Sequence, residues 1–340
     1  MKLRLGHLPS FSSLTPRLAL LAAKDTGQIR AILSSLGPCL ALLAACIFFA
    51  TQSDRFLSGQ NFSLILQQVM VIGVIAIGQT LIILTAGIDL SCGMVMALGS
   101  IVMTKLATDH GMNPYFAVAC SMLVCTLIGY VNGFLVTKIR LPSFIVTLGT
   151  MNMVFAVTQL YSGAQTVTDL PDALLFLGST FQIGQTNITY GTVLMLCIYA
   201  LIWFYLRDTA PGRHIYAVGN SPEAARLSGI ATHRVLLGVY VLAGFLYGVA
   251  ALLSVARMGV GDPQAGQTDN LDSITAVVLG GTSLFGGRGT IVGTLIGVLI
   301  VGVFRNGLTL MGVPSVFQIL VTGILVILAV AADQFTHKKA

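Results

Sequence analysis

Charged residues are scarce in this chain of 340 residues. Lysine, arginine, aspartate and glutamate together make up only 9% of it, against roughly 25% in an ordinary soluble domain. Apolar residues make up 55%, and the mean hydropathy is +0.89. Five stretches carry no charged residue at all: 56–88, 111–137, 141–168, 173–206 and 306–332. Each can supply the roughly 20 apolar residues that cross a bilayer as a helix, so the composition excludes a soluble globular protein.

Motifs of common enzymes are also missing. The run 281–288 has the opening spacing of the nucleotide-binding loop G-x-x-x-x-G-K-[ST], but it lacks the lysine and the serine or threonine. Neither H-E-x-x-H nor G-x-S-x-G occurs, and the six cysteines form no C-x-x-C pair. We therefore expect a chain that is not an enzyme and that binds no metal and no cofactor of its own.

Hydropathy predicts an all-α membrane bundle of about ten spans with both termini cytoplasmic. The predicted spans are 32–51, 63–84, 91–108, 113–137, 142–161, 190–206, 235–256, 272–284, 290–306 and 313–332. This topology puts all but four of the 18 basic residues on the cytoplasmic side, the exceptions being Arg55, Lys105, Arg257 and Arg305. The net charge of +6 is thus explained by the positive-inside rule, and we expect no nucleic-acid partner.

The predicted domains follow from the same topology. Residues 1–31 form a basic cytoplasmic tail, 32–334 a transmembrane domain with a cytoplasmic loop at 207–234, and 335–340 a second basic tail. The span 272–284 is short and runs into a glycine-rich stretch ending at 289. Irregular backbone is tolerated at membrane depth where protein or a water-filled cavity satisfies it, so this span is either re-entrant or followed by an ordinary glycine turn.

A short internal similarity suggests a repeat. Residues 132–135 and 141–144 read NGFL and LPSF, whereas 306–309 and 313–316 read NGLT and VPSV. The predicted topology places the two copies on opposite sides of the membrane, as an inverted repeat requires. Chance is the alternative explanation for so short a match.

The only glutamate of the chain, Glu223, lies in the longest polar loop. Ser221 is a good N-cap, Pro222 suits the first helical position, Glu223 complements the positive helix start, and Gly229 suits the position just past the end. These signals predict a short cytoplasmic helix at 222–229. Its alanines, Ala224 and Ala225, are small enough to let the groove of another protein approach the backbone.

Three separated blocks, 80–91, 215–230 and 276–284, closely resemble the ribose-type sugar permeases of bacterial ABC importers. They read TLIILTAGIDLS, IYAVGN leading into EAARLSGI, and AVVLGGTSL. The resemblance covers about residues 38–334. The Glu-Ala-Ala-x-x-x-Gly block corresponds to the loop by which such permeases contact their ATPases, although the Ile-x-Leu-Pro of the fuller signature is missing.

The resemblance implies a homodimer in the bacterial inner membrane that bears cytoplasmic ATP-binding subunits and receives a monosaccharide from a periplasmic binding protein. ATP and Mg²⁺ would then be bound by the partner subunits and not by this chain. The residues implied in ATPase coupling are Ser221, Pro222, Glu223, Ala224, Ala225, Arg226 and Gly229. The particular sugar is not implied.

A neutral polyol needs hydroxyl and amide partners, which makes several polar residues of the spans candidates for the substrate path. They are Gln67, Gln68, Thr85, Ser91, Asn132, Asn152 and Gln159. Asp89 is a further candidate, because a carboxylate near the membrane is costly and therefore suggests a function. Hydrogen bonding between helices is the alternative role for each, and capping of the following helix is the alternative for Asp89. An ion-coupled secondary transporter is the main rival function, with Asp89 as its only membrane-embedded acid. A passive channel or a membrane anchor is the second rival.

Overall fold

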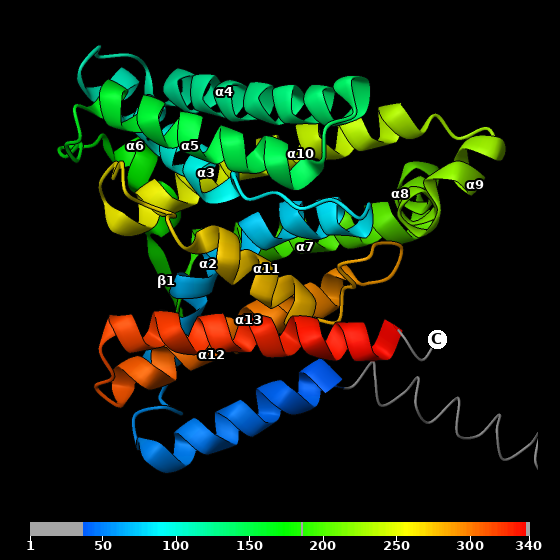
Figure 1. The fold of residues 1–340 in the computed structure, drawn as a ribbon. Coiled ribbons are helices and arrows are strands. Elements are labelled where there is room, and N and C mark those ends of the chain that lie inside the picture. Colours follow the sequence, from blue (N-terminus) through cyan, green and yellow to red (C-terminus); the bar gives the residue numbers. More distant parts are fainter. Residues whose placement is uncertain (1–36, 185, 338–340) are drawn as a thin grey trace, which may run out of the picture.

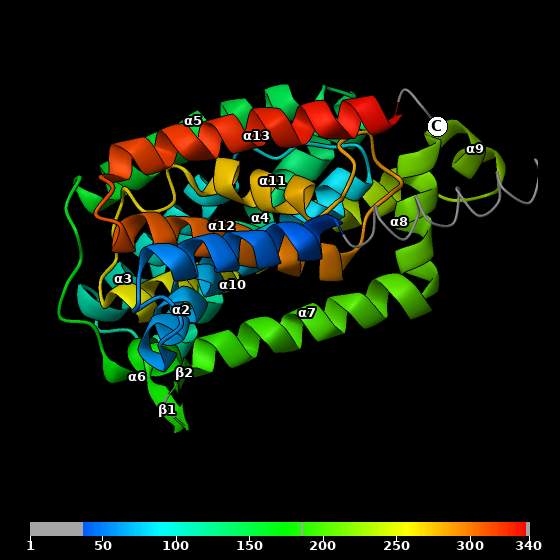
Figure 2. The same cartoon turned by 90° about the horizontal axis from the view of Figure 1, so that it is seen from below.

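A computed structural model describes residues 37–184 and 186–337, so the predicted tail at 1–31 lies outside the described residues. The fold is a bundle of helices that share one long direction (Figures 1 and 2). Its long elements are the helix Gly37–Gln52, α2 (Gly59–Leu84), α3 (Cys92–Thr108), α4 (Pro114–Phe134), α5 (Ser143–Ser162), α7 (Tyr190–Asp208), α10 (Thr232–Met258), α12 (Ile291–Leu310) and α13 (Ser315–His337).

Six of these helices are long and apolar enough to cross a membrane: α2, α5, α7, α10, α12, and α4 together with the π-helical turn Leu135–Ile139 that extends it. Three shorter apolar helices, Gly37–Gln52, Cys92–Thr108 and Ser315–Leu328, fall in three more of the predicted spans. The described part of the chain thus confirms a helical bundle with several spans. Ten crossings remain a prediction. Helix α13 runs to His337, beyond the predicted boundary at 334.

The predicted span 272–284 is wrong as a continuous helix. Helix α11 (Asp269–Leu279) has 11 residues, or about 16 Å at 1.5 Å per residue, roughly half of the ~30 Å apolar core of a bilayer. The glycine-rich segment 280–290 that follows is irregular and packs closely against neighbouring backbone. The Gly287 N–H donates to the Leu84 carbonyl at 2.9 Å, and a Cβ at Gly280 would overlap the backbone of Gly293.

Contacts between helices come in matching pairs. Helix α4 packs on α10, and α12 packs correspondingly on α2. Helix α3 packs on α4, α5 and α10, and α11 packs correspondingly on α12, α13 and α2. The α4–α5 and α12–α13 junctions, which carry the similar sequences at 132–144 and 306–316, lie at opposite ends of the bundle (Figure 1). Both junctions contribute a buried Asn-Gly pair, Asn132-Gly133 and Asn306-Gly307. This pattern supports the predicted inverted repeat, and it places α2–α5 in one copy and α10–α13 in the other.

Helix α2 is the most enclosed span, whereas α4, α5 and α7 expose most of their apolar side chains. Small residues allow a close approach between helices α4 and α10. A Cβ at Gly129 would overlap the Tyr240 carbonyl, and a Cβ at Gly244 would lie 3.1 Å from the Gly129 Cα. Close backbone contact through glycine is a common means of helix association in membranes, where the apolar surroundings provide little hydrophobic driving force.

Two regions depart from the expected all-helical spans and polar loops. The connection between α5 and α7 contains α6 (Asp172–Leu175), the 3₁₀ turn Phe176–Gly178 and an antiparallel hairpin of β1 (Thr180–Ile183) and β2 (Thr186–Thr189). The supposed loop at 207–234 is mostly helical, with α8 (Ala210–Asn220) and α9 (Pro222–Leu227). The hairpin and α9 lie at opposite ends of the bundle (Figure 1), which we call the hairpin end and the α9 end.

Candidate functional site

The local chemistry predicted for the short helix is confirmed in α9. The Ser221 hydroxyl accepts the Ala224 N–H at 3.3 Å, Pro222 begins the helix and Glu223 lies in its first turn. The helix ends at Leu227, two residues before the predicted end at 229. Gly229 has a φ of +86°, a left-handed conformation that residues with a side chain rarely adopt. The sequence from 221 to 229 therefore determines this element through its own capping residues.

The side chains of α9 divide into an exposed and a buried set. Glu223, Ala224 and Arg226 are exposed, and Leu227 is 79% exposed, which is unusual for leucine at a polar surface. Ala225 is only 4% exposed. The prediction that both alanines face a partner is therefore wrong for Ala225, which packs within the protein. Leu227 was missed because its apolar side chain carried no signal of exposure.

Helix α8 connects α9 to the spans by close backbone packing. A Cβ at Gly219 would overlap the Leu84 carbonyl at the end of α2. The Tyr216 hydroxyl donates to the Gly289 carbonyl at 3.1 Å. Helix α8 thus contacts both the end of α2 and the glycine-rich segment between α11 and α12.

Three of the predicted path residues meet in one buried hydrogen-bond network where the chain turns back between α2 and α3. Asp89 Oδ1 accepts from the Ser91 N–H at 2.8 Å and from the Ser91 hydroxyl at 2.6 Å, and Asp89 Oδ2 accepts from the Tyr247 hydroxyl at 3.1 Å. The Asn132 amide donates to Ser91 Oγ at 3.1 Å and accepts from Thr150 Oγ1 at 2.6 Å. The network joins α3, α4, α5 and α10.

Burial and bonding give these residues a role between helices. Asp89 is 2% exposed, Asn132 1%, and Ser91 is fully buried. Asp89 bonds the N–H of Ser91, which precedes α3, so it orders the turn before the helix and does not cap the first N–H groups inside it. Tyr247 and Thr150 were missed by sequence reasoning because nothing local connects them with Asp89 and Asn132.

Replacing Asp89 should therefore affect packing. We expect Asp89→Ala to leave the Tyr247 hydroxyl and the Ser91 donors unpaired, at about 1–3 kcal/mol for each unsatisfied group. Asp89→Asn keeps an acceptor for them and should melt close to the wild type. Thermal melting of the purified protein in detergent measures the difference. Equal melting temperatures for the alanine variant and the wild type would contradict this structural role.

The other path candidates lie apart from this network. Thr85 is buried and bonds the Ile82 carbonyl in its own turn, and the exposed Asn152 bonds the Leu148 carbonyl one turn back. Gln159 bonds the Pro263 carbonyl at the hairpin end. Gln67 is half-buried on α2, and its neighbour Gln68 lines a cavity between α2, α12 and α13. The structure therefore does not bring the predicted path residues into one site.

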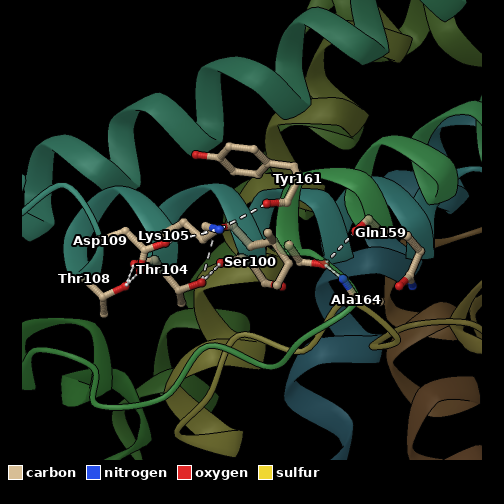
Figure 3. A network of polar contacts seen from close by, with 10 residues as sticks. Ser100, Thr104, Lys105, Thr108, Asp109, Gln159, Tyr161 and Ala164 are labelled. Atoms are coloured by element: carbon tan, nitrogen blue, oxygen red, sulfur yellow. Dashed lines mark hydrogen bonds and ion pairs between the residues drawn. The ribbon is translucent and has the colours of Figure 1, made fainter.

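A second polar cluster holds α3 and α5 together at the hairpin end (Figure 3). The Lys105 amine pairs with Asp109 at 3.2 Å, donates to the Tyr161 carbonyl at 3.2 Å, and lies 5.4 Å from the centre of the Tyr161 ring. The hydrogen bond from Lys105 also lowers the pKa of the Asp109 carboxyl. Among residues 37–184 and 186–337, no group of three or more histidine, cysteine or acidic residues is arranged to hold a metal ion.

Comparison with known proteins agrees with an architecture of several apolar spans. Residues 61–330 match the family described as branched-chain amino acid transport system / permease component, and the chain belongs to this family of permeases. It is 45% identical over 309 residues to the fructose import permease protein of Rhizobium meliloti, with 89% of this chain and 86% of that protein covered.

The names of two further relatives refer to other sugars. The ribose import permease protein of Bacillus subtilis is 39% identical over 305 residues, which cover 89% of this chain and 94% of that protein. The galactose/methyl galactoside import permease protein of Escherichia coli is 34% identical over 315 residues, which cover 88% and 93%. The similarity thus extends over nearly the whole length of each protein.

Proposed function

We propose that this chain is the permease subunit of an ATP-driven bacterial importer that carries a monosaccharide delivered by a periplasmic binding protein. The family membership gives the class, and the names of the relatives support a sugar as substrate. The observation that carries the coupling mechanism is α9, a capped helix with an exposed Glu223, Ala224 and Leu227 that packs through α8 onto the ends of the spans.

In this proposal the α9 end faces the cytoplasm of a bacterial inner membrane, and both termini lie on that side after ten crossings. Two copies of the chain form the pathway. Helices α5 and α13 lie on the same face of the bundle, with α11 between them in the view of Figure 1 (Figures 1 and 2), and their exposed apolar side chains suit the second copy or lipid. Cytoplasmic ATP-binding subunits hold ATP and Mg²⁺, and this chain binds no cofactor.

The secondary transporter is disfavoured by the environment of Asp89. A coupling acid must exchange an ion or a proton with the pathway, whereas Asp89 is 2% exposed and accepts three hydrogen bonds from Ser91 and Tyr247. A passive channel does not need an exposed capped helix connected to the spans. Both observations favour transport driven by a partner at α9.

Uptake by reconstituted vesicles tests the proposal. The permease and its ATP-binding subunits are reconstituted into vesicles with ATP on the cytoplasmic side. The binding protein and radiolabelled fructose, ribose or galactose are added on the other side. We expect accumulation of at least one of the three against its gradient, only with ATP. Accumulation that survives ATP removal but collapses with the ion gradient would establish the secondary transporter, and flux without accumulation would establish the channel.

A further inference from the structure

A pocket of about 450 Å³ opens at the α9 end, where the π-helical turn after α4 meets α9 and the start of α10 (Figure 1). Its lining contains four basic residues, which are Lys138, Arg140, Arg226 and His233. None of the lining residues among 37–184 and 186–337 is acidic. The volume lies within the ~300–1,000 Å³ typical of small-molecule sites. This basic pocket therefore has the size and the charge to receive a small anionic group.

Two spans end at the basic pocket, which places it at the surface of the membrane. Pro114–Ile139, which is α4 with its π-helical turn, has 26 residues, and α10 has 27. At 1.5 Å per residue each is about 40 Å long, whereas the apolar core of a bilayer is ~30 Å thick. The π-helical turn and the first turn of α10 therefore extend into the headgroup layer. Lys138 and Arg140 are exposed, so a lipid headgroup can reach them.

The backbone after α4 brings two of the charges to one place. A π-helix is rare, and single turns of it are frequent at functional sites. Arg140 follows the turn with a φ of +63°, a left-handed conformation that is uncommon for a residue with a side chain. Its N–H donates to the Leu135 carbonyl, which closes the turn. Lys138 and Arg140 thereby line the same pocket although they are only two positions apart.

The opposite wall is the start of α10. Ala231 precedes this helix and offers no side-chain bond to the N–H groups of its first turn. The start of a helix carries a partial positive charge and attracts anions. Thr232 and His233 of the first turn line the pocket, where they add a hydroxyl and an imidazole to the possible hydrogen-bond partners of a ligand. The helix start and the basic side chains thus favour the same kind of ligand.

The positive charge of the basic pocket is not neutralised within the described chain. None of the ion pairs found among residues 37–184 and 186–337 includes one of its residues. Glu223, the acidic residue of α9, is not part of the lining. Such a cluster attracts a group with a net negative charge, and arginine is well suited to bind phosphate oxygens through two N–H groups.

An exposed apolar strip on α4 leads to the pocket. Its side chains are 40–58% exposed and follow one another at spacings of three or four residues, so they share one face of the helix: Leu123, Leu127, Val131 and Phe134. Lys138 continues the same spacing. An apolar strip that ends in a basic residue at headgroup level matches the acyl chains and the phosphate of a lipid. Acidic side chains of a soluble partner would match the charges but not the strip.

We propose that the basic pocket binds the headgroup of an anionic phospholipid. The phosphate contacts Lys138, Arg140 and the start of α10, and the acyl chains lie along the strip on α4. The site goes beyond the proposed import function and requires only that the α9 end lies at a membrane surface. Because Arg226 belongs to α9, the bound lipid also touches the helix that is proposed to couple the permease to its ATP-binding subunits.

Lipid titration of the purified full chain tests the site. The delipidated protein in detergent receives dioleoylphosphatidylglycerol or dioleoylphosphatidylcholine, whose choline group balances the phosphate charge, and native mass spectrometry measures the bound lipid. We expect phosphatidylglycerol to bind about tenfold more tightly. Lys138→Gln combined with Arg140→Gln should abolish this preference. Arg207→Gln combined with Arg213→Gln should retain it, because these two arginines are exposed at the same end but do not line the pocket.

A second variant adds a negative charge without weakening the fold. Glutamate in the first turn of a helix is favourable, so His233→Glu should melt no lower than the wild type. Its carboxylate should nevertheless repel the phosphate and remove the preference for phosphatidylglycerol. Lys138→Arg combined with Arg140→Lys retains both charges and should retain the preference. Melting temperatures in detergent show that each variant is folded.

The controls separate a lipid site from two simpler explanations. Glycerol 3-phosphate lacks acyl chains and should displace phosphatidylglycerol only at about a hundredfold higher concentration than the lipid, or more. Displacement at equal concentration would overturn the lipid assignment and indicate a site for soluble phosphate esters. An equal loss of preference in the Lys138/Arg140 and Arg207/Arg213 variants would show diffuse attraction to a basic surface, which also overturns the proposal.

An unchanged preference in both the double glutamine variant of Lys138 and Arg140 and His233→Glu would refute the site outright. Copurification of the ATP-binding subunits with the same variants would then show whether the basic residues serve that partner instead. Sugar uptake is measured separately, so the import function can stand or fail whatever the lipid titration shows.

Discussion

Ala224→Trp should reduce ATP-driven uptake to less than about a tenth of the wild-type rate while the permease remains folded in the membrane. Ala224 is exposed in the middle of α9, a helix of six residues whose neighbours Glu223 and Leu227 are also exposed. An indole there would prevent a partner groove from reaching the backbone. Weakening partner binding by more than about 1.4 kcal/mol already lowers the affinity tenfold. Uptake in reconstituted vesicles and copurification of the ATP-binding subunits measure the effect.

The control for this experiment is the same substitution at the opposite end of the bundle. Ala173→Trp on α6 is also at an exposed alanine in a short helix, and it should leave copurification of the ATP-binding subunits unchanged. Ala225→Trp is unsuitable because Ala225 is buried and the indole would disturb the fold. Normal uptake by Ala224→Trp in the complete importer would remove α9 from the coupling mechanism.

Glu223→Lys isolates the charge from the shape of the same surface. The carboxylate lies in the first turn of α9, where it stabilises the positive end of the helix by about 0.3–1 kcal/mol. Reversing the charge removes this small stabilisation of the helix, so the fold should survive. We expect uptake to be lost through repulsion or loss of a pair at the partner surface, and Glu223→Gln should be intermediate. Equal uptake by all three proteins would show that the charge plays no part.

Local chemistry made α9 predictable from the sequence. Ser221 caps the helix with its side-chain hydroxyl, Pro222 begins it, and Gly229 follows its end in a left-handed conformation. These signals are local, so the prediction needs no knowledge of distant residues. The burial of Ala225 depends on the packing of α9 against α8 and α10. No one-dimensional pattern in so short a helix could separate its two alanines.

Hydropathy identified the long spans but not the break after α11. The apolar run 276–279 continues into glycines, and hydropathy does not show that the helix ends there. The backbone of this glycine segment is held by contacts with α2 and α12. The hairpin did leave a signal that the prediction overlooked. Residues 180–183 and 186–189 are rich in threonine and isoleucine and flank Gly184, as hairpin strands commonly do.

The sequence could not show which of the candidate polar residues lie together. Asp89 bonds Tyr247, which lies 158 residues further along the chain, and Asn132 bonds Ser91 and Thr150 from different helices. Gln68 lines the cavity between α2, α12 and α13, while Gln67 beside it does not contribute to that lining. Adjacent residues on a helix point about 100° apart, so neighbouring side chains contact different parts of the protein. Which part each one contacts depends on the tertiary arrangement.

Arg305→Met should be among the most destabilising single substitutions in the chain, at about 3–5 kcal/mol. Asp272 is 1% exposed, and its Oδ2 lies 2.6 Å from the Arg305 guanidinium without forming a well-directed hydrogen bond, so the attraction is mainly ionic. Removing the arginine leaves the buried carboxylate without its nearest cation. The melting temperature in detergent should fall clearly below that of Arg55→Met, which removes an exposed arginine near the same end.

A double substitution distinguishes this mechanism from a loss of packing by the long arginine side chain. Asp272→Leu combined with Arg305→Met removes both charges and replaces them with apolar groups of similar volume, and such replacements of buried ion pairs are often neutral or stabilising. We therefore expect the double variant to melt well above Arg305→Met alone. A double variant no more stable than the single one would show that Arg305 stabilises the bundle through its packing, and that the charge of Asp272 is tolerated without it.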